Sequence, residues 1–274
     1  MRSISKFSVV AGTLALATSA VLANGAHAGE KGIWEGYYIG VNAGYSWGTA
    51  DFASALTCPD NNCAFNIAEL PGVFSTVPAL GAGSDESNGF TGGVQVGLNA
   101  QSGTVVYGVE ADFNGLDLGA SHTDTGLLVM GLGQTATVAS SVSADWLITV
   151  RARLGIAVTP TVLAYATAGA AVSDFDVATS YIDDGVGAPA AVAGAGSRSD
   201  LKLGYTVGGG IEWAVSKNWS LKGEYLYVDF GSVSTTAQVN VQQNPAFFGL
   251  TDNQLNTSAD VTTHLGRVGL NYKF

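Results

Sequence analysis

Eight segments of this chain alternate between apolar and polar residues, and this alternation restricts its possible folds more than any other feature. In residues 36–48, GYYIGVNAGYSWG, every odd position is apolar and every even position except Tyr38 is Gly, Asn or Ser. A period of two residues is typical of β-strands with one apolar face. Similar segments follow at 89–100, 105–115, 144–158, 162–175, 200–215, 219–231 and 264–274.

The connections between these segments alternate in length. Short turns are expected near 101–104, 158–161 and 215–218, and long loops at about 49–88, 115–143, 174–199 and 232–259. Transmembrane barrels have short periplasmic turns and long extracellular loops. Ten tilted strand residues rise about 25 Å, which matches the apolar height of such barrels. The sequence therefore predicts an all-β fold: an eight-stranded antiparallel up-and-down transmembrane β-barrel whose apolar face meets lipid.

The first 28 residues have the features of a targeting segment. Arg2 and Lys6 precede an apolar stretch at 7–23, and Ala26-His27-Ala28 has the small-x-small form of a cleavage site. We expect a signal peptide over residues 1–28, removed between Ala28 and Gly29, and a barrel over residues 29–274. The segments after residue 28 contain no run of 18 apolar residues, which a helical membrane span requires.

Charged residues are few, and many of them share the polar face of the expected strands. Residues 1–28 hold two of the 11 basic residues and none of the 22 acidic ones, so the remaining chain carries a net charge of −13. Such a charge repels phosphates and argues against a nucleic-acid partner. The interior of an eight-stranded barrel is only wide enough for side chains. We therefore expect a paired charge network inside the lumen, made of Glu110, Asp112, Arg151, Arg153, Lys202, Glu212, Lys222, Glu224 and Arg267.

Two cysteines and two histidines are the other candidate sites after residue 28. Cys58 and Cys63 flank the turn-forming residues of TCPDNNCAF, and an even cysteine count in an exported chain predicts a disulfide. His122 lies in the expected 115–143 loop, and His264 lies near the outer end of the last segment. The one G-x-S-x-G string, GYSWG at 44–48, lies inside an alternating strand segment and not at a strand-to-helix elbow, and no metal-ligand spacing occurs, so we expect neither enzymatic activity nor a cofactor.

Several of the alternating segments also carry recurring signatures. WEGYYIGVNAGYSWG, YGVEADFNG, VRARLGIAV and HLGRVGLNYKF resemble the small outer-membrane β-barrel family of alphaproteobacteria, the outer-membrane immunogenic or porin-family proteins, over residues 34–274. The resemblance implies an OmpA-like barrel in the cell outer membrane of a Gram-negative bacterium, with both termini in the periplasm. It also implies that Val268, Leu270, Tyr272 and Phe274 form the signal read by the barrel-assembly machinery.

These observations predict an integral outer-membrane protein with a structural or surface-interaction role. Its partners would be outer-membrane lipid and, through acidic surface loops, a host or surface ligand. Three alternatives remain open: a small passive pore for ions or solutes, a haemin-binding surface protein, and a secreted soluble β-sandwich. The haemin alternative comes from the resemblance, which implies that some members of the family bind haemin, and His122 is the candidate residue for that activity.

Overall fold

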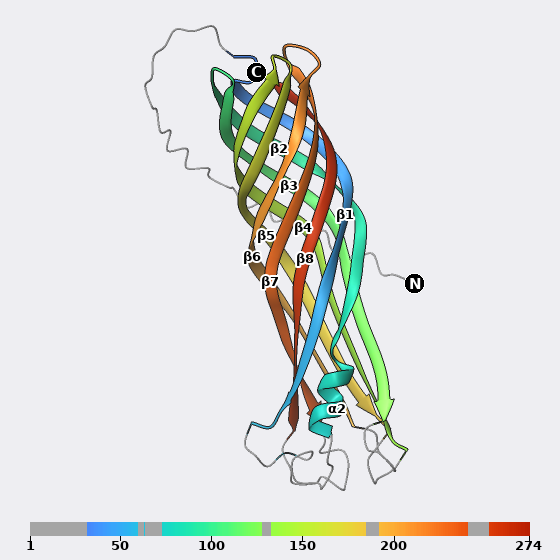
Figure 1. The fold of residues 1–274 in the computed structure, drawn as a ribbon. Helices are drawn as coiled ribbons and strands as arrows, with labels where there is room; N and C mark the ends of the chain where they lie inside the picture. The colour runs from blue at the N-terminus through green and yellow to red at the C-terminus, as the bar shows by residue number, and fades with distance from the viewer. Residues whose placement is uncertain (1–31, 60–62, 64–72, 128–132, 185–191, 241–251) are drawn as a thin grey trace, which may run out of the picture. The chain divides into compact units, whose positions relative to one another are not determined.

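Figure 1 shows the computed structural model, which describes residues 32–59, 63, 73–127, 133–184, 192–240 and 252–274. The expected signal peptide, with Ala28 and Gly29, lies outside these residues. Eight antiparallel strands each pair with the next, and the last pairs with the first to close a barrel. This confirms the predicted fold class and excludes a two-sheet sandwich. The strands are β1 (Gly36–Thr57), β2 (Gly83–Ser102), β3 (Val105–Leu127), β4 (Thr135–Thr159), β5 (Val162–Asp183), β6 (Ala193–Ala214), β7 (Trp219–Asn240) and β8 (Asn253–Lys273).

The strands are about twice as long as a membrane crossing requires. Each has 20 to 25 residues, whereas about 9–11 tilted residues span the hydrocarbon layer. The short connections lie where they were predicted, but the long-loop bounds were wrong. Strands continue from both sides into 49–88, 115–143, 174–199 and 232–259. The chain therefore forms a barrel with two halves, a membrane half next to the short turns and an outer half beyond it.

The strand face that carries the apolar residues differs between the two halves. In the membrane half the outward residues are large and apolar, such as Phe90, which is 81% exposed, and Trp47, which is 42% exposed. In the outer half the inward residues are apolar instead, and Phe52 is only 4% exposed. The alternation along β1 keeps its phase from Trp47 to Phe52, so only the surroundings of the strand change. These surfaces fit lipid around the membrane half and water around the outer half, whose inward apolar residues form a core of their own.

Three apolar clusters fill parts of the interior. A base cluster at the end with the short turns contains Trp34, Val106, Leu163 and Tyr165. In the outer half, a middle cluster includes Phe52, Leu118, Phe175, Phe230 and Leu265, and a tip cluster includes Leu56, Val73, Val77, Val138 and Leu255.

The tip cluster includes residues of a short helix, α2 (Val73–Leu80). Its Val73 and Val77 side chains are fully buried. Figure 1 shows this helix at the end of the barrel opposite the C-terminus. In the described part of the chain, no helix is long and apolar enough to cross a membrane.

Bulges in two strands keep apolar residues inward at the boundary between the two halves. On β4 the buried residues Ala144 and Leu147 are three positions apart, and the β3–β4 register shifts there. On β7 the buried residues Phe230 and Val233 are separated in the same way. Between them Gly231 has a φ of 62°, a conformation that favours glycine. Each bulge shifts the alternation by one residue, so buried side chains occupy the inward positions on both sides of the boundary.

Candidate functional site: the ion network in the barrel interior

Six charged side chains meet inside the membrane half, drawn from four strands. The β3–β4 register pairs Glu110 with Arg151, and the β7–β8 register pairs Glu224 with Arg267. None of the six residues is more than 6% exposed, and three positive charges balance three negative ones. The six residues are Glu110, Asp112, Arg151, Lys222, Glu224 and Arg267.

The distances within this group are those of charge-assisted hydrogen bonds. Arg151 Nη2 lies 2.5 Å from Glu110 Oε1 and 2.6 Å from Asp112 Oδ2. Lys222 Nζ lies 2.8 and 2.9 Å from the two carboxylate oxygens of Glu110. Arg267 Nη2 lies 3.0 Å from Asp112 Oδ2. Burial of such charges is costly unless each is paired, and here every carboxylate contacts at least two cations.

A second ion pair lies nearer the end with the short turns. Arg153 donates to Glu212, and its guanidinium lies 3.7 Å from the centre of the Tyr165 ring. Glu212 also accepts hydrogen bonds from Ser220 Oγ at 2.5 Å and from Asn271 Nδ2 at 2.9 Å. This carboxylate therefore has partners on three strands, β4, β7 and β8.

Two tyrosines join the ion pair to the larger group. The Tyr38 hydroxyl donates to Glu110 at 2.6 Å and accepts from Arg153 at 3.3 Å. The Tyr165 hydroxyl donates to Glu224 at 2.8 Å. The sequence alternation places both residues on the inward face, but their partners depend on the barrel register. Neither tyrosine was therefore expected in the network.

The structure brings together eight of the nine residues expected in the lumen network, and the placement of Lys202 was wrong. Lys202 Nζ lies 3.5 Å from Asp200 on the same strand, and its side chain is 26% exposed. It lies where the β6–β7 ladder is interrupted, between Ala195 and Tyr205. The alternation predicted that the Lys202 side chain points inward, but it did not predict the position of Lys202 along the barrel axis.

His122 is also placed differently from the prediction. It lies within β3 instead of a loop, and its Nδ1 atom is 2.9 Å from Asp85 Oδ2. Its ring stacks on the inward Phe52 at 6.3 Å. His264, expected near the outer end of its strand, lies midway along β8. Among the residues that the structure describes, no three His, Cys, Asp or Glu side chains are grouped to hold a metal ion.

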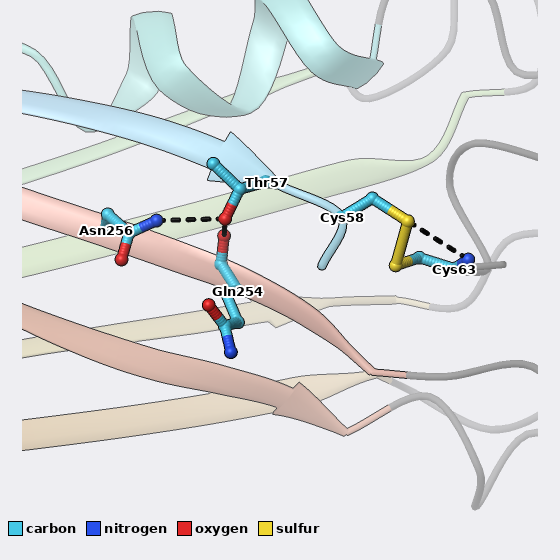
Figure 2. Close-up of a disulfide and its surroundings, with 5 residues drawn as sticks. All are labelled: Thr57, Cys58, Cys63, Gln254 and Asn256. Atoms are coloured by element: carbon cyan, nitrogen blue, oxygen red, sulfur yellow. Dashed lines mark hydrogen bonds between the residues drawn. A yellow bond between two sulfur atoms is a disulfide. The ribbon is translucent and has the colours of Figure 1, made fainter. Parts of the chain in front are cut away.

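Cys58 and Cys63 form a disulfide at the tip, just beyond the end of β1 (Figure 2). The Cys63 backbone N–H donates to Cys58 Sγ at 3.2 Å. Thr57, the last residue of β1, accepts from Asn256 Nδ2 at 2.9 Å and donates to the Gln254 carbonyl at 3.4 Å. These two bonds tie the start of the disulfide loop to β8.

The C-terminal residues expected to form an assembly signal face outward from the membrane half. Val268 and Phe274 are 68% and 75% exposed, and Leu270 is at the same face. The Tyr272 ring packs against Phe274 at 5.2 Å. The Phe274 backbone N–H donates to the carbonyl of Tyr37, at the start of β1. The geometry places these side chains against lipid, while their role in assembly stays a prediction.

Known proteins resemble this chain over most of its length. Residues 13–274 match the model of a family described as "Outer membrane protein beta-barrel domain". The chain is 33% identical over 244 residues to the 31 kDa outer-membrane immunogenic protein of Brucella melitensis, which covers 88% of this chain and 84% of that relative. It is 29% identical over 204 residues to the 22 kDa outer membrane protein of Rhizobium leguminosarum bv. viciae, which covers 73% and 66%.

Among solved structures, the outer membrane protein OprG from Pseudomonas aeruginosa aligns with 89% of this chain and 98% of its own, at 16% identity and a TM-score of 0.41. The family match extends over all eight strands of the closed barrel described above. This chain therefore belongs to the outer-membrane β-barrel domain family and is a protein of the outer membrane.

Proposed function

We propose that this protein is a closed, non-conducting outer-membrane barrel whose outer half presents a rigid tip to the cell exterior. The observation that carries the proposal is the packing of the interior from base to tip. The base cluster, the ion network, the middle cluster and the tip cluster follow one another along the barrel. Each layer contains side chains from several strands, so each one supports closure of the bore.

The chemistry of these layers opposes ion passage. Trp34, Arg151, Phe175 and Val77 represent the four layers, and none is more than 4% exposed. An ion that enters an apolar layer loses its hydration without gaining a polar partner, which costs many kcal/mol. A solute at the ion network would have to break charge pairs that are buried on all sides. This argument favours a structural and surface role over the passive-pore alternative.

The surface of the outer half supports an interaction role. Asp51 and Asp260 lie opposite each other across the β1–β8 ladder, and both are exposed. Asp174 and Asp176 add exposed carboxylates on β5. Such a surface has a negative potential and attracts cationic partners by long-range steering. The proposed role is therefore display of an acidic, rigid surface and its tip beyond the membrane.

Planar-bilayer conductance of the refolded protein tests closure, with a 16-stranded porin in the same bilayer as a positive control. We expect no discrete conductance steps from this protein. Steps that survive repurification of the folded species would contradict the proposal and favour the pore.

Thiol labelling of intact cells tests the display. The Ser234→Cys variant places a thiol on the outward face of the outer half, and Ala168→Cys places one on the lipid-facing wall of β5. A membrane-impermeant maleimide should label Ser234→Cys and leave Ala168→Cys unlabelled. The reverse pattern would show that the outer half does not project from the cell.

A further inference from the structure

Two adjoining hollows lie on the outward wall of β1, β2 and β8. The lower hollow, about 570 Å³, is in the lipid-facing wall of the membrane half. Its floor is formed by the small residues Ala43 and Gly266, and its sides by Tyr45, Phe90 and Val268. The Tyr45 and Phe90 rings pack edge to face at 5.4 Å. The result is an apolar depression in a wall that otherwise carries large side chains.

The upper hollow, about 200 Å³, lies at the outer end of the same wall and is polar. It is lined by Trp47, Thr49, Glu86, Asn88 and His264, with backbone from their neighbours. The Trp47 and His264 rings are stacked at 5.8 Å with planes 13° apart. The Asn88 side-chain oxygen accepts from the Tyr45 hydroxyl at 2.8 Å.

The two hollows share one boundary. A Cβ atom added to Gly266, in the floor of the lower hollow, would lie 3.4 Å from the Trp47 ring in the upper one. Because Trp and Tyr prefer the interface between lipid and water, Trp47 marks the level at which acyl chains give way to headgroups. An amphipathic molecule lying along this wall would thus meet an apolar hollow and then a polar one.

We propose that one glycolipid of the outer leaflet binds here, with an acyl chain in the lower hollow and a sugar ring in the upper one. The half-exposed Trp47 offers a flat aromatic surface to the apolar face of a sugar. Glu86 has no hydrogen bond or ion pair with another described residue, so its carboxylate can accept from sugar hydroxyls. The lower hollow continues the lipid-facing wall, which already establishes that acyl chains contact this surface.

The charges of the hollows favour a sugar over a phosphate group. Glu86 would repel a phosphate from the upper hollow. Arg267 is the single Lys or Arg among the lining residues, and its guanidinium is buried in the ion network with Asp112 and Glu224. No Lys or Arg side chain of the lining is therefore available to an anion. Recognition rests on hydroxyl hydrogen bonds and aromatic contact.

The first experiment measures binding of rough lipopolysaccharide, which lacks O-antigen, to the folded protein in detergent by native mass spectrometry. Ala43→Leu fills the lower hollow, and we expect it to weaken binding about tenfold. Ala168→Leu adds the same side chain to the lipid-facing wall of β5 and should leave binding unchanged. Gly266→Val provides a second filling variant in case Ala43→Leu does not fold. Equal binding by the folded filling variants and the control would overturn the proposal.

The second experiment tests which part of the lipid is recognised. Trp47→Ala and Glu86→Gln should each weaken binding about tenfold, whereas Trp213→Ala, an exposed tryptophan at the opposite rim, should not. Tighter binding by Glu86→Gln would mean that the phosphates are recognised, contrary to the proposal. Displacement of the glycolipid by an equal concentration of phosphatidylethanolamine would reduce the contact to ordinary lipid packing and would also overturn it.

Discussion

Arg151 of β4 places its Nη2 atom between the carboxylates of Glu110 and Asp112 on β3, at 2.5 and 2.6 Å. All three side chains are buried. This contact makes the two adjacent strands dependent on each other at the centre of the membrane half. It also determines where substitutions in the barrel should cost the most stability.

Replacing Arg151 by Met should destabilise the folded barrel by about 3–5 kcal/mol, because it leaves buried carboxylates without a partner. The measurement is the free energy of unfolding in urea with the protein in lipid bicelles. Lys202→Met is the matched control, since the Lys202–Asp200 pair is partly exposed and should contribute at most about 1 kcal/mol. Similar losses in the two variants would contradict burial of the network.

The helix α2 should be held at the tip by burial of its apolar face. Val77→Asp introduces an unpaired charge into the tip cluster, where we expect a cost of about 3 kcal/mol or release of the helix. Ala79→Asp changes an exposed residue of the same helix and should have little effect. Hydrogen exchange of the Leu80 and Gly81 amides, of which Gly81 donates to the Val77 carbonyl, separates the two results. Equal protection in both variants would show that α2 is not anchored through Val77.

Stability at high pH should depend on Tyr181, which lies in the outer half, beyond the membrane. Burial and the neighbouring Asp183 carboxylate raise the pKa of Tyr181 above its ordinary value of 10.0. Its hydroxyl donates to Asp183 at 2.7 Å. Above pH 10 the folded state therefore keeps a proton that the unfolded state releases. The stabilisation from Tyr181 is present below pH 10. As the pH rises further, the free energy of unfolding falls by about 1.4 kcal/mol per pH unit.

The Tyr181→Phe variant cannot ionise at this position. Between pH 10 and 12 its free energy of unfolding should fall less steeply than that of the wild type, whereas at pH 8 it should be lower than the wild type because the buried hydrogen bond is lost. Parallel slopes for the two proteins would mean that Tyr181 ionises freely in the folded barrel.

Phe274→Ala should lower the amount of protein assembled in outer membranes by more than its loss of folding stability accounts for. Phe90→Ala is the control, because Phe90 is also outward, aromatic and highly exposed. Each substitution should reduce the free energy of unfolding by about 1–2 kcal/mol. Quantitative blotting of outer-membrane fractions then separates an assembly role from a stability role. Equal yields of the two variants would leave the C-terminal residues with a packing role alone.

The sequence predicted the membrane half well because its alternation is strong there. Large outward residues such as Tyr37 and Val94 oppose small or polar inward ones, so strand identity, phase and number could all be read. The same alternation predicted that most of the charged residues in the lumen network face inward. It did not predict which of them pair with each other, because pairing depends on the strand register, which alternation alone leaves open.

The outer half was missed because its polarity is inverted. Outward Ser, Thr and Ala residues between small apolar ones, as in TATVASSVSA of β4, have the composition of a loop. Residues such as Val138 and Val142 are nevertheless fully buried. Bulges on β4 and β7 also break the two-residue period near the boundary. His122 was therefore assigned to a loop although it lies in a strand.

The seam between β1 and β8 has a mechanical consequence. Its ladder runs without a register shift from Tyr38↔Lys273 to Thr57↔Gln254, through both halves of the barrel. Antiparallel hydrogen bonds lie perpendicular to the strands, so a pull on the tip along the barrel axis would shear many of them at once instead of opening them singly. Tension applied outside the cell would pass down this seam to the anchored half without a hinge to absorb it.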